Sequence, residues 1–268
     1  GVHDAGAKFM VWFEPERVRK GSLLDTEHPG WLLQLPGSDN RLFDLGNPEA
    51  CKWLIDYISE FLRKEGIDYY RQDFNFDPMP YWTAHDKPGR VGVSEIRHIE
   101  GLYAFWDSLL VRFPDLLIDN CASGGRRIDL ETCARSLPLW RSDNTCDMVG
   151  SDPARIAHAA IKNQLMSCGL NRYVPFSTVG QMGSSPYYFR SGFNGGIAFA
   201  EDCRPADYPR EQLQQAIAEA GFGSSASSRE EIDPWTFVRS WAAGPLSATS
   251  SAPTHPSAAA TPTTPTPV

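Results

Sequence analysis

Short apolar runs alternate along this chain with longer segments in which apolar residues recur at helical spacing. The runs that predict β-strands are Lys8–Phe13, Ile67–Asp73, Asp115–Asn120, Leu137–Asp143 and Asn171–Ser177. The segments that predict helices are Asn47–Gly66, Ser94–Phe113, the region around Arg127–Arg135, Asp152–Gly169 and Pro209–Gly221. Strands that alternate with helices in this way are typical of a parallel sheet covered by helices.

Local signals mark the ends of several of these helices. Pro48 stands at the first position of one predicted helix and Gly66 stops it. Ser94 is the predicted N-cap of the next helix. Asp152 is predicted to cap a later helix that Gly169 ends. These signals make the helices the most sharply bounded elements of the prediction.

The predicted strands end in polar or acidic residues, which suits a (β/α)8 TIM barrel, where catalytic groups lie at the C-terminal ends of strands. The chain opens with a loop-like segment that runs straight into a strand, so we expect a barrel that is incomplete at its N-terminal side. A doubly wound open sheet is the alternative, although no Gly-rich phosphate turn follows an early strand. We assign residues 1–221 to this partial catalytic domain.

The composition changes after the last predicted helix. From Ala242 to Val268 there is no Asp, Glu, Lys or Arg, and Pro, Thr, Ser and Ala dominate. Such a segment cannot bury enough apolar surface to fold, so residues 222–268 are predicted to form a disordered C-terminal tail. A mucin-like linker and a truncated or frame-shifted end are both open interpretations.

Charge and cysteine content narrow the functional classes. The net charge is −8 with a pI near 5.3, and no polybasic patch occurs, so nucleic acid is not an expected partner. No apolar run is long enough to predict a membrane span. The six Cys show no C-x-x-C spacing and are interpreted as free thiols, which favours the cytoplasm over a secreted location.

Acids and amides gather at the ends of four consecutive predicted strands. They are Glu14 and Glu16; Asp73, Asn75 and Asp77; Asp119 and Asn120; and Asp143, Asn144 and Asp147. Such a set either binds a cation or performs acid/base chemistry. Because Arg71, Arg127 and Arg141 are interleaved with the acids, a metal would be repelled, and the arginines would orient carboxylates and hydroxyls instead. We expect no metal and no cofactor; a metal-dependent barrel hydrolase is the alternative.

A pair of carboxylates with different protonation is the arrangement that glycosidases use. Arg71 should favour the anion of Asp73, which suits a nucleophile. Arg141 should also favour the anion of Asp143, which is the wrong state for an acid. Formation of a covalent glycosyl-enzyme would remove the negative charge of Asp73. Asp143 would then have to act as a base and no longer as an acid, which suits a retaining mechanism.

Four motifs in this order resemble the α-galactosidases of glycoside hydrolase family 36. They are KFMVWFEPERV, NPEACKWLIDYISEFLRKEGIDYYRQDFN, LLIDNCASGGRRIDLE and LWRSDN, and the resemblance runs from Gly1 to Gly221. It implies a (β/α)8 barrel that hydrolyses raffinose-type α-galactosides by a retaining double displacement without a metal.

The resemblance also implies residue roles. Asp73 falls on the nucleophile of a Lys-x-Asp-x-Asn motif, and Asp143 falls on the acid/base of a Trp-x-Ser-Asp motif. The Cys-x-x-Gly-Gly loop would line the galactose pocket, where small glycines let the backbone approach the sugar. The predicted substrate-binding residues are Trp12, Glu14, Arg71, Asn75, Cys121, Gly124, Gly125, Arg127 and Arg141.

Two kinds of departure from the family pattern affect the expected substrate and the expected completeness of the catalytic domain. Arg71 stands where Lys is usual and Gln72 where Trp is common, and a planar guanidinium needs more room than an ammonium. This departure leaves open a sugar other than galactose. The alternative functions are those of an α-N-acetylgalactosaminidase, of another α-glycosidase or transglycosidase, and of a degenerate non-catalytic carbohydrate-binding barrel. The family's early acid pair and flanking β-domains have no match, so we hypothesise a fragment with little activity alone, and a homo-oligomer in the full-length form stays open.

Overall fold

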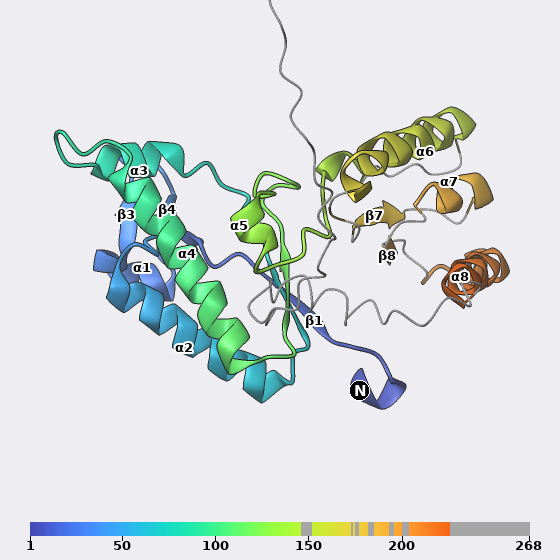
Figure 1. Ribbon diagram of the computed structural model, residues 1–268, viewed down its shortest axis with the longest axis horizontal. Helices are drawn as coiled ribbons and strands as arrows, with labels where there is room; N and C mark the ends of the chain where they lie inside the picture. Colours follow the sequence, from blue (N-terminus) through green and yellow to red (C-terminus); the bar gives the residue numbers. More distant parts are fainter. Residues whose placement is uncertain are drawn as a thin grey trace, which may run out of the picture.

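The computed structural model describes residues 1–145, 152–172, 174, 177–181, 185–192, 196–199 and 204–225 (Figure 1). Of the predicted tail, residues 222–268, those from 226 onward lie outside the described residues, as does Asp147. Four cysteines are described, Cys51, Cys121, Cys133 and Cys168, and all four are free thiols as predicted. Within the described ranges, no helix is long and apolar enough to cross a membrane.

A parallel sheet forms the centre of the molecule. Its strands are β1 (Met10–Phe13), β5 (Tyr69–Gln72) and β6 (Leu117–Asn120), in the order β1-β5-β6. Both pairings are parallel, with Trp12 opposite Arg71 and Arg71 opposite Asp119. The C-terminal ends of these strands therefore meet at one edge, and the predicted parallel α/β sheet is confirmed.

The parallel arrangement continues beyond β6. Asp119 forms a parallel bridge with Leu137, and Trp140 forms another with Thr178, the first residue of β7 (Thr178–Gln181). Strand β7 pairs in parallel with β8 (Gly196–Phe199). Extended segments therefore follow one another in chain order, as in the wall of a barrel. In the described part of the chain this wall is an open arc, since β1 and β8 do not pair with each other.

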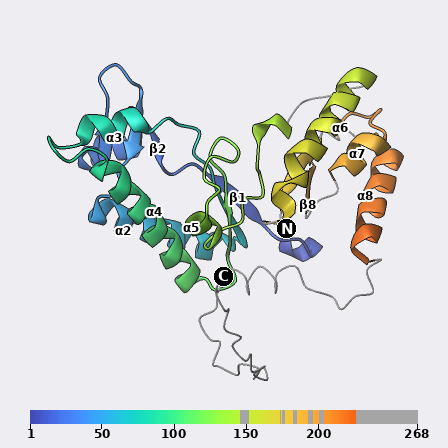
Figure 2. The ribbon, with the colours of Figure 1, turned by 45° about the horizontal axis from the view of Figure 1, so that its top comes forward.

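Two long helices cover one side of this arc. Helix α2 (Pro48–Glu65) begins after Asn47, whose side-chain oxygen accepts hydrogen bonds from the next turn, and ends at Gly66. Helix α4 (Val93–Arg112) packs beside it (Figures 1 and 2). The sequence prediction of α2 is confirmed at both ends.

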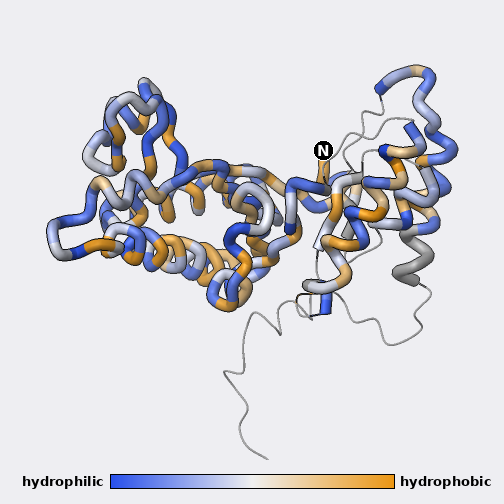
Figure 3. The backbone as a smooth tube through the Cα atoms, turned by 90° about the horizontal axis from the view of Figure 1, so that it is seen from above, coloured by the Kyte–Doolittle hydropathy of each residue, from blue (hydrophilic) through white to orange (hydrophobic). Residues whose placement is uncertain are grey.

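The main core lies between these helices and the sheet. Leu54, Ile58 and Leu62 of α2 and Phe105, Trp106 and Leu109 of α4 are buried against Tyr70 and Ile118 of the strands. Figure 3 shows the corresponding alternation of apolar and polar stretches along the helices. Burial of this surface is the principal stabilisation of the strands that carry the polar edge.

A small antiparallel sheet follows β1 and was not predicted. Its strands are β2 (Arg17–Arg19), β4 (Asn40–Phe43) and β3 (Leu32–Gln34), in the order β2-β4-β3, with α1 (Leu23–Glu27) in the connection. Leu42 of β4 is fully buried in a second apolar cluster with Phe74 and with two aromatic residues, Tyr81 and Trp82, of α3 (Met79–His85). This cluster supports the segment that leaves β5.

Several predicted boundaries are corrected. Helix α4 starts at Val93, and Ser94 is not its cap. The carboxylate of Asp86 accepts hydrogen bonds from the backbone N–H groups of Gly92, at 2.6 Å, and Ser94, at 2.9 Å. The cap therefore comes from a loop residue that is not adjacent to the helix, where local N-cap rules do not look.

The C-terminal elements differ more from the prediction. Leu170–Arg172 is a 3-10 helix, so the predicted strand Asn171–Ser177 is wrong at its start, and the strand β7 follows at Thr178. Helix α5 is shorter than expected (Leu130–Cys133) and α8 longer (Arg210–Ser225). Helix α6 (Pro153–Cys168) has the predicted Asp152 cap, and α7 (Pro186–Ser191) was not predicted. Figures 1 and 2 place α6, α7 and α8 together, away from α2 and α4.

Candidate active site

Asp73 is the first residue after β5, and its carboxylate is held by donors from three parts of the chain. Trp12 of β1 donates its indole N–H to Oδ2 over 3.2 Å. The backbone N–H of Phe74 donates to Oδ1 over 2.8 Å, and that of Ser123, in the loop after β6, donates to the same oxygen over 3.3 Å. Asp73 is only 7% exposed, so these bonds fix the carboxylate at the C-terminal edge of the sheet.

The surroundings of Asp73 favour its anion. Burial alone raises the pKa of this carboxyl, but hydrogen bonds from Asn75, Cys121, Phe74 and Trp12 outweigh burial and lower the pKa below its ordinary value. Hydrogen bonds rather than a flanking cation therefore supply the main stabilisation. This corrects the reason predicted from the sequence, which assigned that effect to Arg71.

Arg71 is engaged on the neighbouring strand. Its guanidinium forms an ion pair and hydrogen bond with the carboxylate of Asp119, which is opposite it in the sheet. The guanidinium carbon also lies 5.7 Å from the centre of the Trp140 ring. Burial lowers the pKa of Arg71, but Asp119 outweighs burial and raises it, so the side chain is a fixed cation.

Asp143 lies at the next position along the arc. It begins a 3-10 helix, Asp143–Thr145, and not the end of a strand as predicted. Its Oδ1 accepts a hydrogen bond from the indole N–H of Trp140 over 3.1 Å. The side chain is exposed, in contrast to that of Asp73. Each of the two aspartates is therefore held by a tryptophan, and the two differ in burial.

The loop after β6 touches both aspartates. Cys121 continues the parallel ladder, since its N–H donates to the carbonyl of Gln72 over 2.8 Å. Burial raises the pKa of the Cys121 thiol to about 12, so the thiol stays protonated and can donate to Asp73. Ser123 holds Asp73, and a Cβ added to Gly124 would lie 3.0 Å from the backbone nitrogen of Asp143.

Glu14 and Asn75 brace this loop from the other side. Glu14 accepts a hydrogen bond from the backbone N–H of Asn75 over 2.7 Å and pairs with Arg17. The amide oxygen of Asn75 accepts from the hydroxyl of Ser123 over 3.1 Å. Glu14 and Asn75 were predicted from the sequence to be pocket residues, and the structure brings both to the surroundings of Asp73.

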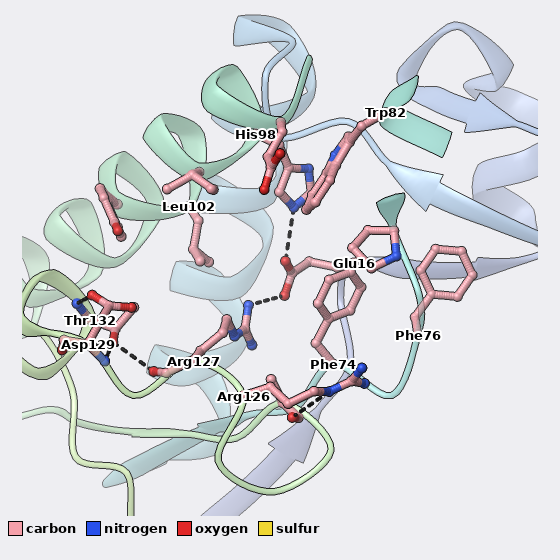
Figure 4. A pocket seen from close by; sticks show the side chains of 15 residues that line it. Glu16, Phe74, Phe76, Trp82, His98, Leu102, Arg126, Arg127, Asp129 and Thr132 are labelled. Atoms are coloured by element: carbon pink, nitrogen blue, oxygen red, sulfur yellow. Dashed lines mark hydrogen bonds and ion pairs between the residues drawn. The ribbon is translucent and has the colours of Figure 1, made fainter. Parts of the chain in front are cut away.

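Behind this edge lies a buried polar network centred on Glu16 (Figure 4). Its carboxylate accepts hydrogen bonds from Arg127 at 2.8 Å, from His98 at 3.0 Å and from Gln72 at 2.8 Å. Burial alone raises the pKa of Glu16, but Arg127, His98 and Gln72 together lower it to about 2. Glu16 is therefore a buried anion whose two carboxylate oxygens both accept hydrogen bonds.

Arg127 and Arg141 are placed differently from Arg71. Arg127 bridges Glu16 and the carbonyl of Cys121, at 2.8 and 2.9 Å, and so supports the loop after β6. Arg141 donates to the backbone carbonyl of Val174, and burial lowers the pKa of its guanidinium to about 10. Among the described contacts, neither guanidinium bonds to Asp73 or Asp143.

A cavity of about 300 Å³ opens beside this network, between α4 and the loops after β5 and β6 (Figure 4). Phe74, Trp82, His98 and Arg127 are among its lining residues, whereas Asp73 and Asp143 are not. This cavity is therefore separate from the two aspartates. In the described part of the chain, no group of three or more His, Cys, Asp or Glu could hold a metal ion.

Several residues that build this site were not predicted from the sequence. Ser123 supplies both a backbone and a side-chain contact and is the one non-glycine residue with positive φ, at 46°, among those described. Gln72, noted only as a departure from the family, is fully buried and bonds Glu16. Asp119 was predicted to be an acid at a strand end, but its ion pair with Arg71 was not predicted. For Ser123 the signal available was its position directly before two glycines.

Comparisons with known proteins agree with the motifs. A protein-family model described as Melibiase matches residues 1–161. Alpha-galactosidase 1 from Pediococcus pentosaceus is 33% identical over 150 residues, which cover 54% of this chain and 20% of that protein. The chain thus spans about a fifth of the length of the curated relatives that it matches.

Solved structures show the same fold. The α-galactosidase AgaA A355E of Geobacillus stearothermophilus in complex with 1-deoxygalactonojirimycin gives a TM-score of 0.68 at 23% identity, over 82% of this chain and 32% of that one. The A355E D548N variant in complex with raffinose gives 0.67 at 22% identity, over the same shares. The family match covers most of the described parallel sheet and both aspartates. The chain belongs to the melibiase family of glycoside hydrolase family 36.

Proposed function

We propose that this chain contributes to an α-galactosidase that hydrolyses terminal α-galactosides of the raffinose type through a covalent glycosyl-Asp73 intermediate. The observation that carries the proposal is the environment of Asp73. A buried carboxylate with a lowered pKa lies at the C-terminal edge of a parallel sheet, where barrel enzymes place catalytic groups. It is ionised and held in one orientation, which a nucleophile requires.

The reaction has two balanced steps. In the first, an oxygen of Asp73 forms a bond to the anomeric carbon as the glycosidic bond breaks, and the acid form of Asp143 gives its proton to the leaving oxygen. In the second, Asp143 takes a proton from water, whose oxygen attacks the same carbon and releases Asp73. The exposure of Asp143, with the Trp140 indole as its one side-chain donor among the described residues, suits a group that exchanges protons with water.

A terminal α-galactosyl unit is the proposed substrate group. The AgaA structures named above hold raffinose and a galactose-like iminosugar, which supports this class for a family member. Trp12 is 51% exposed although its N–H is bonded to Asp73, so its ring face can pack against a sugar beside the nucleophile. Asn75, Cys121 and the fixed cation of Arg71 supply polar groups around the same point.

Glu14, Arg127 and Arg141 have a different proposed role. Each of these side chains already bonds to at least one protein group, namely the Asn75 N–H, the Cys121 carbonyl or the Val174 carbonyl. We assign them to the support of the pocket walls and not to direct sugar contact.

The test is hydrolysis of raffinose by the full-length protein and by its Asp73→Ala variant. Loss of the nucleophile should lower kcat by about 10³-fold or more. Asp77→Asn is the matched control, because Asp77 is an exposed carboxylate four residues further along the chain. An Asp73→Gly variant given azide should yield the β-galactosyl azide. Raffinose hydrolysis near the wild-type rate by Asp73→Ala would refute the nucleophile role.

A further inference from the structure

The two glycines after Ser123 lie where the chain segment of Asp143 packs most closely on the loop after β6. A Cβ built on Gly124 would lie 3.0 Å from the backbone nitrogen of Asp143 and 3.1 Å from the Cα of Ser142. One built on Gly125 would lie 2.4 Å from the carbonyl oxygen of Arg141. These neighbours are backbone atoms, which cannot rotate away as a flexible side chain would.

The same short loop holds the other aspartate. The N–H of Ser123 donates to Asp73, and its hydroxyl bonds Asn75. Arg127 fixes the start of the loop through the carbonyl of Cys121. Ser123 therefore fixes the loop to Asp73, and the adjacent glycine determines how closely Asp143 can approach it.

We propose that Gly124 and Gly125 are positioning residues that set the location of Asp143 relative to Asp73. The close approach that these glycines permit is between two protein backbones, whereas the sequence predicted a close approach between the backbone and the sugar. This inference rests on the proposed roles of Asp73 and Asp143. The glycines act through Asp143 and have no chemical role of their own.

The inference predicts a loss that depends on the leaving group. A displaced Asp143 protonates the leaving oxygen poorly, so substrates with a basic leaving group suffer most. A nitrophenolate leaves without that proton, so the first step on a p-nitrophenyl α-galactoside is spared. The second step still needs Asp143 to activate water, and azide, which needs no base, can replace water there.

The experiment compares Gly124→Ala with Gly89→Ala in the full-length protein. Both glycines have left-handed backbone, with φ of 83° and 75°, but a Cβ on Gly89 would meet no atom within 4 Å. We expect Gly124→Ala to lower kcat/KM on raffinose about 100-fold, the scale for misplacement by about 1 Å. Its kcat/KM on the p-nitrophenyl substrate should stay near wild type, and azide should raise the kcat that remains. Gly89→Ala should not lower kcat/KM on raffinose relative to kcat/KM on the p-nitrophenyl substrate.

A Gly124→Asn variant keeps the test valid if Gly124→Ala does not fold. Asn adopts left-handed backbone more readily than Ala but adds the same Cβ. Equal losses on both substrates, or no loss on raffinose, in the folded variant would overturn the positioning role. A wild-type protein that hydrolyses neither substrate would instead refute the proposed function, so the two failures are distinguishable.

Discussion

The indole N–H of Trp12 donates a hydrogen bond to Oδ2 of Asp73 over 3.2 Å, from the adjacent strand of the parallel sheet. The rest of the ring remains about half exposed, at 51% for the residue. One side chain thus combines an electrostatic contact with the proposed nucleophile and an open aromatic face. These two properties can be separated by mutation, because phenylalanine keeps a ring but has no N–H.

Trp12→Phe should move the acidic limb of the pH profile to higher pH. The N–H of Trp12 is one of the hydrogen bonds that lower the pKa of Asp73, so its removal raises that pKa. As the pH falls, the Asp73 carboxylate of the variant is therefore protonated at a higher pH than that of the wild type. The measurement is kcat/KM against pH, which reports groups of the free enzyme.

Trp31→Phe is the control for this measurement, since Trp31 stacks on His28 and lies at a tilted angle against Trp53, and neither is one of the aspartates. Its acidic limb should coincide with that of the wild type. A Trp12→Phe variant with reduced activity but an unmoved acidic limb would show that the hydrogen bond does not tune Asp73.

Local sequence signals were enough to predict the elements whose boundaries are set by neighbouring residues in the chain. Helix α2 has its cap and stop within its own sequence, and β5 follows it closely and begins with two tyrosines, so both could be predicted. The position of Asp73 followed from β5, because a residue just after a parallel strand must lie at the sheet edge. That placement required no knowledge of long-range contacts.

Long-range contacts account for what could not be predicted. Glu16 meets His98 and Arg127 across separations of 82 and 111 residues, and no spacing in the sequence reveals these pairs. Arg71 was expected to act on Asp73, two residues away, but the sheet register gives it Asp119 as its partner. Short strands such as β2 and β3 could not be predicted from the alternation of apolar and polar residues either, since each has only three residues.

Glu16→Gln should destabilise the fold strongly. The glutamate is 1% exposed and accepts from Arg127, His98 and Gln72, so its neutral replacement leaves the partly buried Arg127 cation without its counter-ion. Removing one partner of a buried ion pair costs about 3–5 kcal/mol. Urea unfolding measures the free energy of unfolding directly.

Glu60→Gln provides the comparison within the same protein. Glu60 pairs with Arg63 on the exposed surface of α2, with side-chain exposures of 70% and 61%. Such a pair contributes at most about 1 kcal/mol. Similar losses for Glu16→Gln and Glu60→Gln would mean that the buried network does not stabilise the fold.

The same glutamate predicts how stability depends on acidity. The pKa of Glu16 is about 2 in the folded protein and near 4.5 when unfolded, so the unfolded chain binds its proton first as the pH falls. The stabilisation from Glu16 is therefore complete above pH 4.5 and is lost progressively as the pH falls towards 2. Glu16→Gln should unfold with a shallower pH dependence in this window. An unchanged slope between wild type and variant would contradict the assignment.

Arg71 offers a graded test of its contact with Asp119. Arg71→Ala leaves the Asp119 carboxylate buried, with 3% side-chain exposure, and without its cation, so we expect a loss of about 3–5 kcal/mol. Arg71→Lys keeps a cation near Asp119 but loses the guanidinium contact over the Trp140 ring, which is worth about 1–2 kcal/mol. Thermal or urea unfolding of the two variants should therefore rank wild type above Lys and Lys above Ala. If Lys and Ala were equally destabilised, the ion pair would not be the dominant contact, and the guanidinium contact of Arg71 over the Trp140 ring would have to account for the loss.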